Sequence, residues 1–385
     1  MTAPLATLPP SVRAFESARS DVIRELVVWV ARMWPPDKPM DPAVWFQRYA
    51  EAYADAVTAA QLEVALLAVE SVDHAVALQR GERRPGVGEV NPAALASVDG
   101  TGRPVMGLAY ASAGVVGGAV AGATEAGGNA TVALAEAWRS AALMLVQATQ
   151  TAVSDTSRTA KSLAMVSQRV GWIRVLTPPS CARCVVLAGK FHRHATADFD
   201  RHPGCDCTQM PYDYDVKDPR FSGLVFDANE YVRGLSVADQ DRLLGKVNAQ
   251  AVRDGADVTQ VINARRGMAT VRDRFGARTQ VTTEGTTKRG WASRYLRATY
   301  DSKLVKQPGS RYRRTDRPRL MPAEIYRMAG NDQDMALSLL HKNGYLMTAG
   351  PRLTGEFDFF PRDQEVAAAA ARVHARLKSR GVRAA

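Results

Sequence analysis

The chain has 385 residues, of which 46% are hydrophobic, a proportion typical of a globular protein with room for two or three domains. The first twenty residues lack a basic region followed by an apolar run, so we expect no secretory signal. The four cysteines are too few and too clustered for a disulfide scaffold, which favours a reducing compartment. The formal net charge is +11.

Residues 1–169 are predicted to form a helical N-terminal domain. The dipeptide Asp41-Pro42 suits a helix start, because an acceptor side chain caps the helix and proline fits its first turn. From Val44 to Gln79 apolar residues recur every three or four positions, which predicts an amphipathic helix facing a bundle core. Gly81 to Gly102 is rich in proline and glycine and is predicted to be a loop, and a second helix is predicted from about Ala130 to Ser167.

The stretch from Val105 to Thr124 carries no charged residue and is long enough to cross a bilayer. It is rich in Gly and Ala, and Gly114, Gly118 and Gly122 place small residues along one helix face. Such a face suits close helix packing in water as well as in a membrane. Because large aliphatic side chains are scarce, we expect no membrane partner.

Residues 170–275 are predicted to form a small zinc-stabilised α+β module with following helices. The segment from Gly171 to Leu176 is typical of a short strand, and the turn after it leads to the first cysteine. A helix is predicted from Ser236 to about Arg253, because Ser236 and the acidic residue three positions later resemble a capping box. A short helix is predicted from Val258 to Arg265.

All four cysteines lie between positions 181 and 207, with the spacing of a metal site. Two residues separate Cys181 from Cys184, one residue separates Cys205 from Cys207, and His202 stands three residues before Cys205. Two close thiolate pairs with a histidine supply the sulfur and nitrogen ligands that tetrahedral Zn²⁺ prefers. These five candidate ligands compete for four positions, and the spacing does not choose among them.

The same residues allow three kinds of site. A closed set of four ligands would make the zinc structural, holding a segment too small for a core of its own. A catalytic zinc needs an open position and a general base, and the sequence has neither a His-Glu-x-x-His motif nor a His-x-Glu deaminase signature. We therefore predict a structural zinc. His192 and His194 are additional candidate ligands, and free or disulfide-bonded cysteines are the remaining alternative.

The positive charge is concentrated between Arg265 and Arg319, where sixteen Lys and Arg against four Asp and Glu give +12 and leave −1 for the rest. Residues 276–318 show little apolar periodicity and are predicted to form a flexible basic arm. Aromatic residues alternate with arginines there, a pattern that can stack on bases and contact phosphates. A solvated linker or a loosely packed surface helix is the alternative. The candidate nucleic-acid-binding residues are Arg289, Arg294, Arg297, Arg311, Arg313 and Arg314.

Residues 319–385 are predicted to form a helical C-terminal region. Helices are expected to begin at Met321-Pro322, to run from Asp332 to Lys342, and to run from Gln364 to Arg380. The fold class predicted for the whole chain is mainly α: an N-terminal helical bundle, the small zinc module, and a helical C-terminal region with the basic arm.

The cysteine window resembles a family of phage proteins. Cys181-x₂-Cys184, then Gly189, then His202-x₂-Cys205-x-Cys207 is similar to the F protein family of phage Mu. More closely, it resembles the MuF-like minor capsid or head-morphogenesis proteins of tailed phages of actinobacteria. The segments Asn263–Met268 and Met321–Tyr345 are also similar to those proteins, so the resemblance covers roughly Val170 to Tyr345.

The resemblance implies a minor structural protein of the virion, present in a few copies beside the portal in the capsid interior. It implies a role in head morphogenesis, with assembly in the host cytoplasm. The partners it implies are the portal protein and the major capsid or scaffolding protein, with packaged DNA as a further partner of the basic arm.

Two other functions stay open at the level of the sequence. Some relatives are described as capsid maturation proteases, which makes an enzyme of capsid maturation the first alternative. The chain has no Gly-x-Ser-x-Gly motif, and no pair of residues stands out as nucleophile and base, so we favour a protein without catalytic residues. A zinc-knuckle nucleic-acid-binding protein unrelated to phage is the second alternative.

Overall fold

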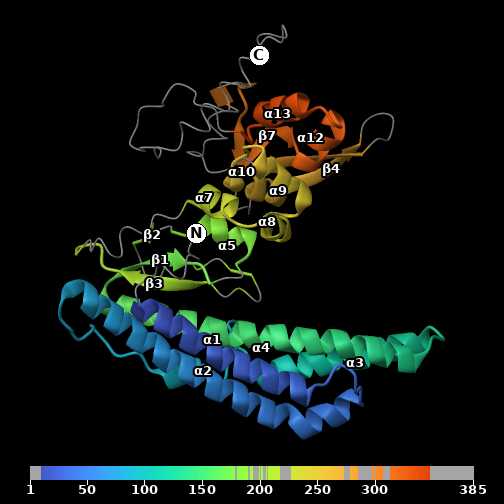
Figure 1. Ribbon diagram of the computed structural model, residues 1–385. Coiled ribbons are helices and arrows are strands. Elements are labelled where there is room, and N and C mark those ends of the chain that lie inside the picture. The colour runs from blue at the N-terminus through green and yellow to red at the C-terminus, as the bar shows by residue number, and fades with distance from the viewer. Residues whose placement is uncertain are drawn as a thin grey trace. The chain divides into compact units, whose positions relative to one another are not determined.

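The structure, a computed structural model, divides into two compact units, Met1–Phe226 and Asp227–Ala385, called the first and the second unit. The fold is mainly helical, as predicted, and the described residues also form two small antiparallel sheets (Figure 1). The residues that the structure describes are 10–177, 180–189, 191–193, 199, 201–202, 205, 207–216, 227–272, 278–284, 297–298, 300–306 and 313–346.

The first unit is built on a bundle of long helices that confirms the predicted N-terminal helices. In Figure 1 the long helices α2 and α4 run side by side, and both α1 and α3 pack against them. Asp41 caps α2 as predicted, because its carboxylate accepts hydrogen bonds from the backbone N–H groups of Ala43 and Val44. The bundle helices are α1 (Pro10–Met33), α2 (Pro42–Arg80), α3 (Met106–Glu125) and α4 (Ala130–Gln168).

A cluster of tryptophans fills one part of the bundle core. Trp34 and Trp138 stack with ring centroids 4.4 Å apart, and Trp45 lies 4.1 Å from Trp34. Each indole N–H donates to a backbone carbonyl, so these buried polar groups are satisfied. The predicted loop between α2 and α3 is confirmed, apart from one short 3₁₀ helix at Pro92–Leu95.

Two helices of the bundle, α2 and α3, are long and apolar enough to cross a membrane by length and composition alone. The core helices of water-soluble proteins pass the same criterion, so it does not separate the two environments. Helix α3, whose one charged residue is Glu125 at its end, is packed against α2 and α4 over one face, where Ala109, Ala113 and Val116 are buried.

A three-stranded sheet completes the first unit and confirms the strand predicted at Gly171. Strand β1 lies between its two partners in the order β2-β1-β3, and both pairings are antiparallel. Trp172 points into a cluster with Val72 and Met165 of the bundle, whereas Ile173 packs with Val12 on the opposite face. The elements of this part are β1 (Gly171–Val175), α5 (Ala182–Leu187), β2 (Phe191–His192) and β3 (Thr208–Tyr212).

The two units do not coincide with the domain boundaries expected after residues 169, 275 and 318. Strands β1 and β3 pack directly on α2 and α4, so the cysteine segment belongs to the same compact unit as the bundle. The physical reason is the small size of the sheet. Both faces of β1 are buried, and the bundle supplies much of the apolar surface that covers them.

The second unit combines short helices with a four-stranded antiparallel sheet in the order β4-β5-β7-β6. Its helices are α7 (Ala228–Arg233), α8 (Val237–Leu244), α9 (Lys246–Arg253), α10 (Val258–Ala264), α12 (Pro322–Ala329) and α13 (Gln333–Lys342), with a 3₁₀ turn at Arg265–Gly267. Its strands are β4 (Met268–Arg272), β5 (Arg278–Glu284), β6 (Leu304–Lys306) and β7 (Arg313–Leu320).

Two predictions for this unit are corrected. The helix expected from Ser236 to Arg253 is interrupted at Gly245, whose φ of +81° ends α8 before α9 begins. The flexible basic arm expected at 276–318 is wrong for most of its described residues, which form β5, β6 and most of β7. Ser236 caps α8 as predicted, because its hydroxyl accepts from the backbone N–H of Asp239, and the same hydroxyl donates to the Asp239 carboxylate. The helix expected at Gln364–Arg380 lies outside the described residues.

Candidate metal centre

The two cysteine pairs meet because of the pairing of β1 with β3. Val175, the last residue of β1, lies opposite Thr208, the first residue of β3. The chain that leaves β1 reaches Cys181 and Cys184 at the start of α5, and the chain that enters β3 carries the second pair. Residues that are far apart in the sequence are therefore held at the same end of the sheet.

Cys184 stands at the middle of the cluster. Its Sγ lies 3.3 Å from Sγ of Cys205, and its backbone N–H donates to Sγ of Cys181 at 3.3 Å. Cys184 belongs to two groups whose ligand atoms lie within 4.8 Å of one another, one with Cys181 and His202, the other with Cys205 and Cys207. The structure thus brings all five predicted ligands together, and the cluster can bind a metal ion.

The structure bears on two alternatives left open by the sequence: disulfide bonds between the cysteines, and His192 and His194 as additional ligands. All four cysteines are free thiols in the structure. His192 stacks its ring on Trp172, with centroids 3.8 Å apart, and belongs to neither group of candidate ligands. His194 lies outside the described residues.

The thiols perturb one another because they are close and largely buried. Hydrogen bonding from the Cys184 side chain lowers the pKa of Cys181 to about 5 against the effect of burial, with further lowering by His202. Hydrogen bonding with Cys181 raises the pKa of Cys184, whereas hydrogen bonding with Cys184 lowers the pKa of Cys205. For Cys207, a hydrogen bond with Cys184 lowers the pKa, but Cys205 and burial raise it to about 11. Cys181 and Cys205 therefore ionise easily, whereas Cys184 and Cys207 stay protonated unless a bound cation stabilises their thiolates.

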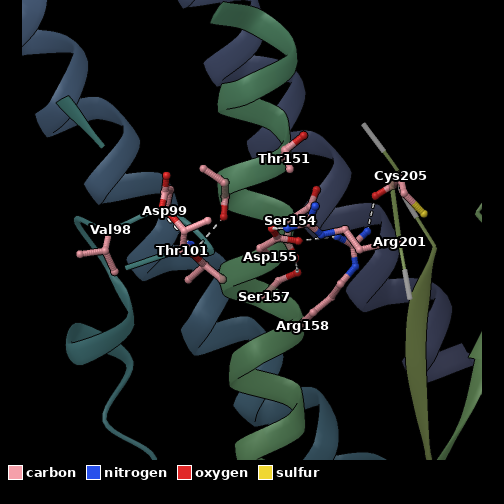
Figure 2. Close-up of polar contacts among 12 residues, drawn as sticks. Val98, Asp99, Thr101, Thr151, Ser154, Asp155, Ser157, Arg158, Arg201 and Cys205 are labelled. Atoms are coloured by element: carbon pink, nitrogen blue, oxygen red, sulfur yellow. Dashed lines mark hydrogen bonds and ion pairs between the residues drawn. The ribbon is translucent and has the colours of Figure 1, made fainter. Parts of the chain in front are cut away.

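A buried ion pair of helix α4 contacts the backbone of the second cysteine pair. Arg158 donates through Nε to the carbonyl oxygen of Cys207 at 3.0 Å and through Nη2 to the carbonyl oxygen of Cys205. It also donates to Asp155 at 3.0 Å, and Asp155 pairs with Arg201, the residue before His202. Figure 2 shows Asp155 and Arg158 on the side of α4 that faces Arg201 and Cys205.

A second buried arginine approaches the cluster from β1. Nη1 of Arg174 lies 3.9 Å from Sγ of Cys184, and its guanidinium carbon lies 3.7 Å from the ring centroid of Phe199. The guanidinium of Arg158 lies 5.2 Å from the same ring. The Phe199 ring thus holds two cations beside the thiols, and one of them, Arg158, contributes to the lowered pKa of Cys205.

The sequence did not predict these supporting residues. Asp155, Arg158 and Lys161 recur at three-residue intervals in α4, and all are buried. The regular spacing places these residues on one helix face, but from the sequence alone a polar face of a helix is predicted to be exposed to solvent. Only the pairing with residues about fifty positions away turns the stripe inward.

We compared the chain with protein-family models, with curated proteins and with solved structures. None of the three comparisons returns a match.

The candidate nucleic-acid-binding residues fall into two groups. Arg297 is described and exposed, Arg313 and Arg314 lie on β7, and the side chain of Arg314 is exposed. Arg289, Arg294 and Arg311 lie outside the described residues.

Proposed function

We propose that the chain is a minor structural protein of a tailed-phage head that acts in head morphogenesis beside the portal and carries a structural zinc ion. The resemblance of the cysteine window to MuF-like proteins supports the phage role. The observation that carries the zinc assignment is the convergence of four free thiols and one imidazole at the end of one sheet.

The residues present fit such an ion. Four of the five side chains of Cys181, Cys184, His202, Cys205 and Cys207 would hold it, and three of the four cysteines are buried. Bound there, zinc would supply a cross-link between α5 and the segment before β3. Buried thiols around a closed site favour a structural ion over a catalytic one.

Metal analysis of the purified chain tests the zinc assignment. We expect one zinc ion per chain by elemental mass spectrometry, lost in a Cys184→Ser variant and retained in a variant of an exposed residue such as Lys38→Met. Cobalt substitution should give the intense ultraviolet charge-transfer absorption of thiolate ligands. A chain that is purified under reducing conditions and binds neither ion would refute the assignment.

Mass spectrometry of purified particles tests the role in the head. We expect the intact chain at a few copies per particle, and normally processed capsid protein in particles made with the double variant Cys181→Ser, Cys184→Ser. Absence of the chain from mature particles, together with uncut capsid protein in the variant, would instead identify an enzyme of capsid maturation.

The sheet of the second unit supports packaged DNA as a partner. Arg272 of β4 and Arg278 of β5 are directly opposite each other, and both are exposed. Like charges in a cross-strand pair destabilise a sheet, and phosphate groups of a polyanion would remove that cost. Arg314 and Lys306 add exposed positive charge to the same sheet.

Salt-dependent binding of duplex DNA tests this partner. We expect the double variant Arg272→Gln, Arg278→Gln to bind more weakly and to lose about two units of the slope of log K against log salt. The matched control is Arg24→Gln, an exposed arginine of α1 that has an acidic partner, Asp21. Equal affinities and slopes for all three proteins would exclude the sheet as the binding surface.

A further inference from the structure

Arg158 of helix α4 contacts the backbone of the candidate metal centre. Its side chain is 7% exposed, and two of its nitrogens donate to the carbonyl oxygens of Cys205 and Cys207. These carbonyls belong to two candidate ligands, so the guanidinium fixes the backbone that aims their sulfur atoms. Figure 2 shows the guanidinium of Arg158 pointing from α4 toward Cys205.

Asp155 ties the histidine side of the centre to the same helix. Its Oδ1 accepts from Nη1 of Arg158 at 3.0 Å, and its Oδ2 pairs with Arg201. Arg201 is the neighbour of His202, which belongs to the other group of candidate ligands. Asp155 therefore contacts the residue before His202 directly, and it reaches Cys205 and Cys207 through Arg158.

The charges around the cluster match a site rich in thiolates. Asp155 carries one negative charge and is shared by two arginines, Arg158 and Arg201. A buried guanidinium is costly unless an opposite charge compensates it. A divalent ion with three thiolates has a net charge of −1, and with four thiolates −2, so a thiolate-rich centre supplies the missing negative charge.

We propose that Arg158, oriented by Asp155, is the positioning residue that couples metal binding to the docking of Cys205 and Cys207 on helix α4. This inference rests on the proposed metal centre. Metal binding fixes the sulfur atoms of Cys205 and Cys207, Arg158 fixes their carbonyl groups, and each contact strengthens the other. Outer-shell groups of this kind change metal affinity by about 10- to 100-fold.

Zinc affinity, measured by competition with a chromophoric chelator, tests the proposal. We expect Arg158→Met to weaken zinc binding by about 10- to 100-fold, and Asp155→Asn to weaken it less, because Arg158 keeps its contacts to the carbonyls. The control Arg24→Met removes an exposed arginine of a neighbouring helix and should bind as the wild type does. Cobalt spectra with unchanged band positions would show that the ligands are the same in all proteins.

Hydrogen exchange separates coupling from a general loss of fold. In the wild type, removal of zinc should increase exchange in residues 205–212, and in Arg158→Met that exchange should stay high with zinc bound. If Arg158→Met does not fold, Arg158→Lys decides: it keeps the charge but cannot reach both carbonyls, and should still bind zinc more weakly.

The outcomes distinguish the two proposals. A wild-type chain that binds no zinc overturns the metal centre itself and this inference with it. A wild type that binds zinc, with Arg158→Met or Arg158→Lys and Asp155→Asn equal to it in affinity and exchange, overturns only the role of Arg158.

Discussion

At the scale of single residues, Cys184 occupies a position that none of the other four candidate ligands shares. It is 1% exposed and belongs to both groups of side chains that can hold a metal ion. Cys181 is only half-buried, and each of the other candidates belongs to one group alone. Because five ligands compete for four positions, losing a peripheral ligand leaves a substitute, whereas losing Cys184 removes the common member.

We therefore predict unequal effects for the cysteine variants. Cys184→Ser should reduce zinc affinity by more than about 100-fold, and Cys181→Ser or Cys207→Ser by about 10-fold, because the fifth candidate takes the open position. Chelator competition gives the affinities, and cobalt spectra count the thiolates that remain. Equal losses for Cys181→Ser and Cys184→Ser would show that no substitute ligand exists.

Lys161 is a second residue whose environment makes a quantitative prediction. Its ammonium is buried, 3.3 Å from the carboxylate of Glu16 and 3.0 Å from the carbonyl oxygen of Gln209. Burial lowers the pKa of Lys161 to about 8 from the usual 10.5, although Glu16 opposes the shift. Between these two pH values the unfolded chain binds a proton that the folded chain does not, so stability rises with pH.

The free energy of unfolding should therefore contain a contribution from Lys161 that grows by about 3 kcal/mol between pH 8 and pH 10.5. Urea unfolding at several pH values, for the wild type and Lys161→Met, measures it as a difference. Both proteins contain the same four thiols, so the contribution of the thiols to the pH dependence cancels in the difference, which leaves that of Lys161. An exposed lysine, Lys38→Met, is the control, and parallel pH profiles for wild type and Lys161→Met would contradict the prediction.

At the scale of elements, Gly→Ala substitutions in helix α3 and in strand β1 should change the stability of the chain in opposite directions. Gly114, Gly118 and Gly122 lie inside α3, are exposed, and have open space where a Cβ would be. Glycine inside a helix costs about 0.5–1 kcal/mol relative to alanine, so each Gly→Ala change should stabilise the chain by about that amount. At Gly171 of β1, by contrast, a Cβ would lie 2.4 Å from the carbonyl oxygen of His192.

Gly171→Ala should consequently destabilise the chain, by about 1–3 kcal/mol, because strand β2 must move away from β1. Thermal unfolding of Gly171→Ala beside Gly118→Ala provides the comparison, with the wild type between them. A lower melting temperature for Gly118→Ala than for the wild type would contradict the prediction. It would indicate that Gly118 packs closely against a second molecule, because the chain itself leaves space for a Cβ there.

The sequence predicted the elements whose signals are local. Helices α2 and α4 and the N-cap at Ser236 were predicted because the apolar period and the caps lie within a few residues of one another. The strands between Arg278 and Leu320 were missed because arginine and threonine hide the alternation, and their stability comes from pairing across long distances in the chain. The cysteine spacing predicted the candidate site, but its support by Asp155 and Arg158 depends on tertiary contacts.

At the scale of the whole molecule, the division into two units separates the metal centre from much of the chain. All five candidate ligands and their supporting arginines lie in the first unit. The second unit has buried apolar residues of its own, among them Val261, Ile325 and Leu340. Five of the six tryptophans also lie in the first unit, so tryptophan fluorescence reports mainly on that part.

Removal of the metal should consequently destabilise the first unit and leave the second nearly unchanged. A ligand that binds only the folded state stabilises it by about 4 kcal/mol at a concentration 1,000 times its dissociation constant. For a unit of this size that energy corresponds to about 10 °C in melting temperature. The full chain is heated in two samples, one with zinc and one with a chelator and a thiol reductant. The tryptophan transition should lie about this much lower in the sample with the chelator.

Amide exchange in α9 and α10 of the second unit should be the same in both samples. An equal loss of protection in those helices would show that the two units unfold as one, and the metal would then stabilise the entire chain.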